Sequence, residues 1–402
     1  MSRLRRRTAC AKIEGMKKIL VLLTSTDNVR TEVMSGVREF ATEADWELLH
    51  VAYDGTPIPV RDLMKFWSPA GCIVEATGDG VTAGTIPWRA FGKVPVVYIG
   101  GDTPVTPPGA TCVVHDATDA GGTAAKELLA LGLDNFAFVG MGGKDWSRRR
   151  EEAFAAALRM NGKTLDETDV RHGGKDNTRL RKWIDGLPKP CGLFAACDSI
   201  AATVLSVCRT GGISVPDDIS VIGVDDNAAL CESTSPTLTS IHPDFRQGGR
   251  LAARILARKL AGQGVVPQKT VFAISGVVRR GSTRRTKRKD ACVVEALERI
   301  WRPGGVRLTP KDIVENFPCS RRNAEIRFKM ATGRSILDEI LAARVEEAKR
   351  LLAATVLPVS SVAEQCGYAS LAHFRDAFRA ATGLNPLAWR KGESGKKSPS
   401  RS

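Results

Sequence analysis

The sequence predicts a two-lobed α/β protein built from parallel sheets and βαβ units, followed by an all-α domain with two helix-turn-helix units. Two observations predict this division. Between residues 17 and 278, short apolar runs alternate with amphipathic stretches, as in parallel strands connected by helices. After residue 290, every periodic segment has helical spacing. The 402 residues, 43% of them hydrophobic, suffice for two or three domains.

With some 260 residues, the segment 17–278 is long for one such sheet, so we expect two lobes. Strands are predicted at Ile19–Leu23, Leu48–Ala52, Gly71–Val74, Val94–Ile99, Thr111–Val114, Phe136–Gly140, Gly192–Ala195, Ser220–Val224 and Thr270–Ile274. Helices are predicted between them at Val29–Ala44, Asp119–Leu131, Arg149–Met160, Ser199–Arg209 and Phe245–Leu260.

Charge is distributed unevenly along the chain. Residues 279–402 contain 26 Lys and Arg against 13 Asp and Glu, whereas residues 19–278 contain 26 against 30. Phosphate backbones attract a basic tail through counterion release, so the charge favours a nucleic-acid partner, although a solvated basic surface gives the same count. Residues 279–290 are basic and show no periodic pattern of apolar residues, so they are predicted to be a linker. This linker either touches DNA phosphates or is a solvated hinge.

Composition also narrows the class of protein. No run approaches the roughly 18 apolar residues of a membrane-spanning helix, and the ten cysteines are scattered without CxxC or zinc spacing. The apolar run that follows Met16 is too short for a secretory signal. We therefore expect a cytoplasmic, nucleoid-associated protein with reduced thiols, no metal and no cofactor. Residues 1–16 are expected to be a basic disordered extension and residues 393–402 a disordered tail.

The segment 291–392 is predicted to contain the two helix-turn-helix units. In the first, Thr309 caps a helix that has Pro310 and Asp312 in its first turn, and Ser320 caps the next helix. The buried stripe of that second helix is Ala324, Phe328 and Ala331. Its outer face carries the candidate DNA contacts Arg321, Arg322, Glu325, Ile326 and Lys329.

The same arrangement recurs further along. Pro358–Cys366 is predicted as one helix, Gly367 as the turn and Ser370 as the cap of a second helix. That helix has the predicted buried stripe Phe374, Ala377, Phe378 and Ala381, and the outer candidates Ala372, Arg375, Asp376 and Arg379. Ile336–Ala353 is predicted as a longer helix between the units, with Leu337, Ile340, Leu341, Ala348 and Leu351 at helical spacing.

Residues 308–391 resemble the DNA-binding domain of AraC-type regulators. The resemblance rests on Ser320–Asn323, Arg327–Lys329, Gly333, Arg344, Ala348–Leu352, Pro358, Val362–Ala363, Cys366–Tyr368, Ser370, Phe374, Phe378, Gly383, Pro386 and Trp389–Arg390. It implies that each outer face enters the major groove of double-stranded DNA. Ile326 stands where many members carry a polar base reader, and Ala372 and Asp376 bring little positive charge. We infer that the first unit reads more bases and the second positions the backbone.

Residues 17–278 resemble the effector-binding core of LacI-type repressors and periplasmic sugar-binding proteins. The resemblance rests on Asp116, Gly121–Gly122, Phe136–Gly140, Arg150, Phe154, Cys197–Ala201, Gly212–Asp226, Pro236–Ile241 and Val278–Thr283. LacI-type repressors carry the DNA-binding unit before this core, whereas the order here resembles that of xylose operon regulators. This implies a homodimeric transcription regulator of sugar-utilisation genes that binds a monosaccharide such as xylose. A non-sugar effector fits the same architecture.

In the resembling cores the ligand lies between the lobes, at the carboxyl ends of the strands. The matching positions are Arg150, Asp198 and Asp225, whose charged groups suit sugar hydroxyls, and Trp146 offers an apolar platform. On the other lobe the candidates are Ser25, Thr26 and Asp27, which follow the first strand. Most of these residues also have a structural interpretation that needs no ligand. Asp198 and Asp225 can cap helices or loops, Trp146 can be a packed surface ring, and Thr26 and Asp27 can be turn residues.

An enzyme is the main alternative class. Gly140–Gly143 follows a strand, but it lacks the GxGxxG spacing and the acidic residue that dinucleotide binding requires. The sequence contains no GxSxG, HExxH or Walker motif, and its five histidines are scattered. A periplasmic binding protein is disfavoured by the missing signal and by the basic helical tail. The prediction is therefore a regulator without enzymatic activity.

Overall fold

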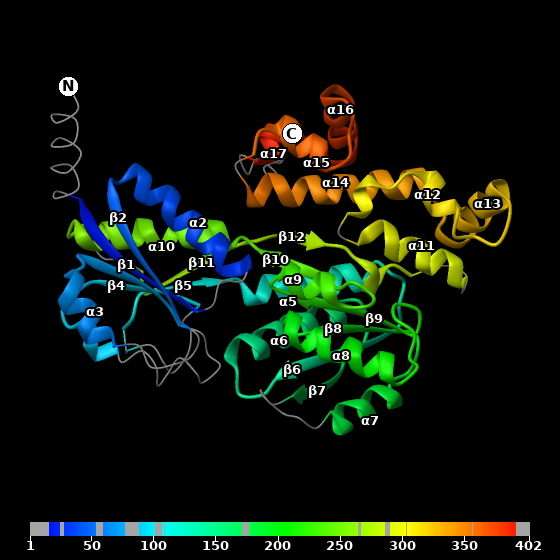
Figure 1. The fold of residues 1–402 in the computed structure, drawn as a ribbon. Helices are drawn as coiled ribbons and strands as arrows, with labels where there is room; N and C mark the ends of the chain where they lie inside the picture. The colour runs from blue at the N-terminus through cyan, green and yellow to red at the C-terminus, as the bar shows by residue number, and fades with distance from the viewer. Residues whose placement is uncertain are drawn as a thin grey trace, which may run out of the picture.

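The computed structural model describes residues 16–24, 28–53, 59–76, 88–100, 107, 109–170, 177–263, 267–285, 290–302, 304–355 and 357–390. These residues form two α/β lobes and a helical domain (Figure 1). Except for Met16, the predicted N-terminal extension and C-terminal tail lie outside this part of the chain. None of the helices in the described ranges is long and apolar enough to span a membrane.

Lobe 1 is a six-stranded sheet in the order β11-β5-β4-β3-β1-β2, and every neighbouring pair of strands is parallel. The middle of each central strand is apolar and buried because helices cover the sheet. The strands are β1 (Lys17–Thr24), β2 (Trp46–Tyr53), β3 (Gly71–Glu75), β4 (Val96–Ile99), β5 (Cys112–His115) and β11 (Lys269–Phe272). The helices are α2 (Asn28–Glu43), α3 (Val60–Trp67), η1 (Trp88–Phe91) and α10 (Phe245–Leu260).

Lobe 2 is a six-stranded sheet in the order β12-β10-β9-β8-β6-β7, in which β10 and β12 pair antiparallel and the other pairs are parallel. The strands are β6 (Asn135–Met141), β7 (Asp166–Val170), β8 (Cys191–Ala195), β9 (Ile219–Val224), β10 (Thr239–Pro243) and β12 (Ile274–Val278). The helices are α5 (Ala117–Leu129), α6 (Asp145–Met160), α7 (Thr178–Gly186), α8 (Asp198–Thr210) and α9 (Ala228–Ser233), followed by η2 (Gly281–Thr283).

The chain crosses between the lobes after β5, after β10 and between β11 and β12. The crossing segments are tied together, because the Asp116 N–H donates to the Phe272 carbonyl and the Asp244 N–H donates to the Ala273 carbonyl, each at 3.0 Å. The crossovers after β5, β10 and β11 all leave from the carboxyl end of a strand. These ends of the two sheets therefore border the gap between the lobes.

The helical domain has two apolar cores that share one long helix. The first core joins α11 (Ala291–Trp301), α12 (Pro310–Val314) and α13 (Arg321–Thr332) to the start of α14 (Ile336–Ala354). The second joins the rest of α14 to α15 (Val359–Gln365) and α16 (Leu371–Thr382). The remaining elements are η3 (Gly305–Arg307) and α17 (Pro386–Arg390). The predicted double helix-turn-helix arrangement, with one helix holding both units, is confirmed.

The predicted helix caps are present. Thr309 and Asp312 form a reciprocal capping box at the start of α12, with Pro310 in the first turn. The Ser320 hydroxyl accepts a hydrogen bond from the Asn323 N–H, and the Ser370 hydroxyl accepts one from the His373 N–H. These local interactions need no tertiary partner, and for that reason the sequence revealed them.

Other predictions were wrong. The strand expected at Thr270–Ile274 is split between β11 in lobe 1 and β12 in lobe 2, because the chain crosses at Ala273. Ala381 was placed on a buried stripe but is exposed, and Leu337, one of the apolar residues at helical spacing in the long helix, is exposed too. Two strands were missed: β7 is an edge strand of mostly polar residues, and β10 buries Thr239 and Ser240 where apolar residues were expected.

The alternative of a solvated hinge does not hold for residues 279–285. The Ser282 hydroxyl, fully buried, donates to the Val221 carbonyl of β9. The Arg280 guanidinium is buried beside Asp226, and Arg285 donates to the Asp217 carbonyl at 3.3 Å. This part of the basic run is packed against lobe 2, because its polar groups find buried partners there. Residues 286–289 lie outside the described ranges.

Candidate ligand cavity and nucleic-acid interface

A cavity of about 350 Å³ lies between the two lobes. Its size is within the range of small-molecule sites. Apolar and aromatic side chains line much of it, including Trp146, Phe245 and Phe272. The polar groups on its wall include Glu75, His115, Lys144, Arg150, Ser199 and Asp225. A few polar groups on an apolar, aromatic wall suit a small ligand that has both hydroxyl groups and C–H faces.

Arg150 is an almost fully buried residue in the wall of this cavity, and it contacts both lobes. It stands on α6 of lobe 2 and donates through Nη1 to the Ala196 carbonyl. Its Nη2 lies 2.6 Å from Nε2 of His115, the last residue of β5 in lobe 1, and 3.5 Å from Oδ1 of Asp225. Its Nε is buried and has no hydrogen-bond partner among the described residues. Arg150 also lines the cavity, so its guanidinium is placed to meet a ligand hydroxyl there.

His115 is neutral in this setting. Burial, together with the charge of Arg150, lowers the pKa of His115 to about 3. A neutral imidazole has an acceptor nitrogen, so Nε2 can accept the hydrogen bond from Arg150. His115 thereby holds the guanidinium without competing with it as a second cation.

Trp146 and Asp225 both face the cavity beside Arg150. The Trp146 ring is half-buried, and the Arg150 guanidinium lies over it, 4.8 Å from the ring centre. The ring therefore packs against Arg150 and also lines the cavity. Asp225 follows β9 and adopts a φ of 112°, a conformation that non-glycine residues rarely adopt. Such backbone strain is often found at binding sites.

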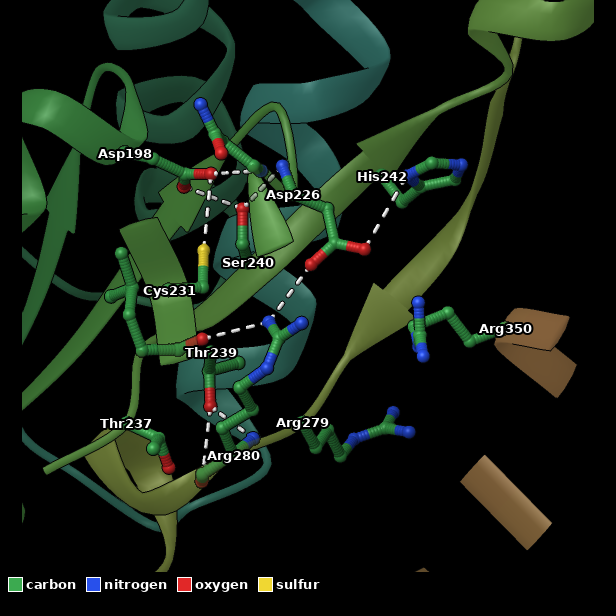
Figure 2. Close-up of polar contacts among 12 residues, drawn as sticks. Asp198, Asp226, Cys231, Thr237, Thr239, Ser240, His242, Arg279, Arg280 and Arg350 are labelled. Carbon is green, nitrogen blue, oxygen red and sulfur yellow. Dashed lines mark hydrogen bonds and ion pairs between the residues drawn. The ribbon is translucent and has the colours of Figure 1, made fainter. Parts of the chain in front are cut away.

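Asp198 is not among the residues that line the cavity. Figure 2 shows that its carboxylate contacts Ser240 and Cys231 instead. It accepts hydrogen bonds from the Ser240 hydroxyl at 2.6 Å and from the Asn227 N–H at 2.9 Å. The Cys231 thiol donates to it at 3.2 Å. Burial, with the nearby charge of Asp225, raises the pKa of Asp198 to about 8. These contacts favour the capping alternative for Asp198.

The structure thus brings three of the seven predicted ligand residues together: Trp146, Arg150 and Asp225. Ser25, Thr26 and Asp27 lie outside the described residues. Sequence reasoning missed Glu75 and His115, which also line the cavity. Each directly follows the last residue of a predicted strand, Val74 or Val114. Inspecting the residue after each predicted strand would therefore have found both.

A second polar cluster connects the lobes next to the cavity, and Figure 2 shows two of its members, His242 and Asp226. His242 of β10 places Nε2 3.3 Å from Oε2 of Glu32 on α2 and Nδ1 3.5 Å from Oδ2 of Asp226. Burial alone would lower the pKa of His242, but the Glu32 carboxylate, with Asp226 and Asp244, outweighs it and raises that pKa to about 9. His242 is therefore a cation near neutral pH and joins an acid of lobe 1 to an acid of lobe 2.

The outer faces of α13 and α16 are exposed, as predicted. Arg321, Arg322, Glu325, Ile326 and Lys329 of α13 and Ala372, Arg375, Asp376 and Arg379 of α16 all lie on the surface. Arg321 and Glu325 form an ion pair at 3.1 Å, which lowers the free charge of that face. Both helices project from α14, so their exposed faces are held by a single rigid element.

Comparison with known protein families matches both parts of the chain. Residues 102–283 match the periplasmic binding protein-like domain, and residues 313–392 match a helix-turn-helix domain. The chain combines a periplasmic-binding-protein-like domain with an AraC-type helix-turn-helix domain. It is a transcription regulator.

The similar proteins share this order of domains over nearly their full length. The regulator is 28% identical over 389 residues to the xylose operon regulatory protein of Escherichia coli K12, covering 93% of this chain and 96% of that one. It is 24% identical to the Haemophilus influenzae protein of the same name, covering 94% and 99%. A solved structure described as a xylose-binding transcription activator is 25% identical with a TM-score of 0.58, covering 93% and 98%.

We predict that the Glu32–His242–Asp226 cluster stabilises the regulator in a pH-dependent way. The pKa of His242 in the folded protein is about 9, above its ordinary value of 6.5. The stabilisation is therefore fully present below pH 6.5 and is lost as the pH rises through 9, and it amounts to at most about 3 kcal/mol. Urea unfolding gives the unfolding free energies of wild type and His242→Gln at each pH. The difference between the two proteins should become smaller as the pH rises from 6.5 to above 9. A constant difference would contradict the assignment.

Proposed function

We propose that the regulator responds to a monosaccharide, in the first instance D-xylose, which binds in the cavity between the lobes and alters how the helix-turn-helix units meet DNA. The observation that carries the proposal is the constellation of Arg150, Asp225 and Trp146 in that cavity. A guanidinium and a carboxylate on one wall can donate to and accept from neighbouring hydroxyls, and an indole ring covers a C–H face.

Similar proteins support the choice of ligand. The Escherichia coli and Haemophilus influenzae relatives are named for the xylose operon, and the solved neighbour is described as xylose-binding. D-Xylose is therefore the first probe. A non-sugar effector is the alternative if no monosaccharide binds the wild-type protein.

The exposed faces of α13 and α16 support contact with the major groove of double-stranded DNA. A helix in this position presents three or four side chains to base edges. We propose that Arg322 on α13 reads a base, since it is exposed on the outer face beside Ile326 and Lys329. We propose that α16, with Ala372 and Asp376 outward, contributes more to backbone positioning.

We also propose that two copies act together on DNA. A solved neighbour that shares the fold of the sensor lobes is described as a dimeric Lac repressor. Two copies bring four helix-turn-helix units to one operator, so the spacing between the copies becomes the quantity that an effector can regulate.

The ligand assignment predicts that Asp225→Asn weakens D-xylose binding at least about tenfold, since a hydrogen bond to a charged group is worth about 1.5–3 kcal/mol. Isothermal titration calorimetry measures this directly. Asp134→Asn, an exposed acid of lobe 2 that pairs with Lys163, is the matched control and should bind as wild type. Unchanged affinity in Asp225→Asn would place the ligand elsewhere.

The DNA assignment predicts that Arg322→Ala weakens binding to the preferred sequence by about 1–3 kcal/mol and relaxes discrimination at one base position. Arg302→Ala changes an exposed arginine that directly follows α11 and pairs with Glu298, and this variant is the control. Fluorescence anisotropy with specific and random duplexes separates the two effects. An equal loss on both duplexes would make Arg322 a phosphate contact only.

A further inference from the structure

Asp225 and Asp226 are neighbours with different surroundings. Asp225 lines the cavity, with Oδ1 3.5 Å from Nη2 of Arg150. Asp226 is almost completely buried, and its Oδ1 lies 2.8 Å from Nη1 of Arg280 (Figure 2). Both residues have positive φ, 112° and 47°, and the Asp226 N–H is fixed by the Ser240 hydroxyl at 3.0 Å. A change at Asp225 therefore has to move Asp226 as well, because the strained turn leaves little room for independent adjustment.

Arg280 belongs to the segment that leaves the sensor lobes. Its N–H donates to the Thr239 hydroxyl at 2.7 Å, and its Nη1 also donates to the Leu238 carbonyl at 2.9 Å. The next turn, η2, packs against β9 and β10 of lobe 2 and against α11 of the helical domain. The position of this segment is thus set by lobe 2, and in particular by the carboxylate of Asp226.

Four residues later the same segment contacts the helical domain. Nη1 of Arg284 lies 2.7 Å from Oε1 of Glu339 on α14, and the guanidinium stacks on the Trp301 ring of α11. The buried Glu339 also accepts a hydrogen bond from Nε1 of Trp301 at 3.0 Å. Arg284 thereby joins α11 to the start of α14, the helix that holds both helix-turn-helix units.

We propose that the buried Asp226–Arg280 ion pair transmits the state of the cavity between the lobes to the DNA-binding helices. Asp226 couples to the cavity through Asp225 and to lobe 1 through His242 and Glu32. Arg280 couples to α11 and α14 through Arg284. The proposal rests on the proposed function only in taking the cavity as the effector site.

The coupling can be tested on the full-length, ligand-free protein by hydrogen–deuterium exchange. Asp226→Asn keeps the size of the side chain but removes its charge. We expect exchange to rise several-fold in α11 and in the first two turns of α14, while β6, β8 and α16 exchange as in wild type. Asp134→Asn is the control. A change confined to residues 225–231, with α11 and α14 unaffected, would overturn the proposal.

A second variant tests the same link from its other end and remains informative if Asp226→Asn does not fold. Arg284→Met removes the contacts with Glu339 and Trp301. Coupling is reciprocal, so this variant should raise exchange at residues 225–231, in the sensor. No change there would overturn the proposal. In the double variant Asp226→Asn/Arg284→Met the increases in exchange should not add, because both substitutions break the same connection. Additive increases would show two independent contacts.

These exchange measurements need no sugar, so failure of D-xylose to bind would refute the proposed ligand and leave their outcome valid. With the sugar present, Arg284→Met should still bind D-xylose but lose most of the sugar's effect on DNA affinity. A full sugar effect in that variant would contradict the link.

Discussion

The three crossovers between the lobes are the constraint on which the rest of the structure depends. Because the chain leaves β5, β10 and β11 at their carboxyl ends, these ends of both sheets border one gap. The polar residues that follow strands, such as His115 and Asp225, therefore meet there, although they are far apart in the sequence. The last crossover leads into β12, which runs back along β10 from the end of the sheet that borders the gap and continues into the segment 279–285 that leads to the helical domain. One strand thus joins the gap between the lobes to the exit segment.

Buried charges mark both of these places. Arg150 is fully buried in the cavity wall, and the Asp226–Arg280 pair is almost fully buried beneath the exit segment. Removing charges from water is costly, and apolar residues of similar volume are often as stable in such positions. Stability alone therefore does not account for them. A ligand site and a link between domains both give reasons for keeping charges that have defined directions and few alternative partners.

The sequence predicted the elements that carry their own local signal, such as the apolar strands of both lobes and the capped helices after Thr309, Ser320 and Ser370. The resemblance also singled out Arg150 and Asp225, which both line the cavity. It could not reveal contacts between distant segments, such as Glu32 with His242 or Asp226 with Arg280. Asp198 shows the limit well: its position after a strand suits a ligand contact, but Ser240, Asn227 and Cys231 occupy its oxygens.

The central claim is that sugar binding and DNA binding are coupled in one protein. The most direct measurement is the affinity of the full-length protein for D-xylose, alone and saturated with a duplex that it has selected from random sequences. Thermodynamic linkage requires that DNA change the affinity for sugar by the same factor by which sugar changes the affinity for DNA. We predict equal factors of about 5–150, as is typical of coupled sites. Sugar affinity that is identical with and without DNA would contradict the account.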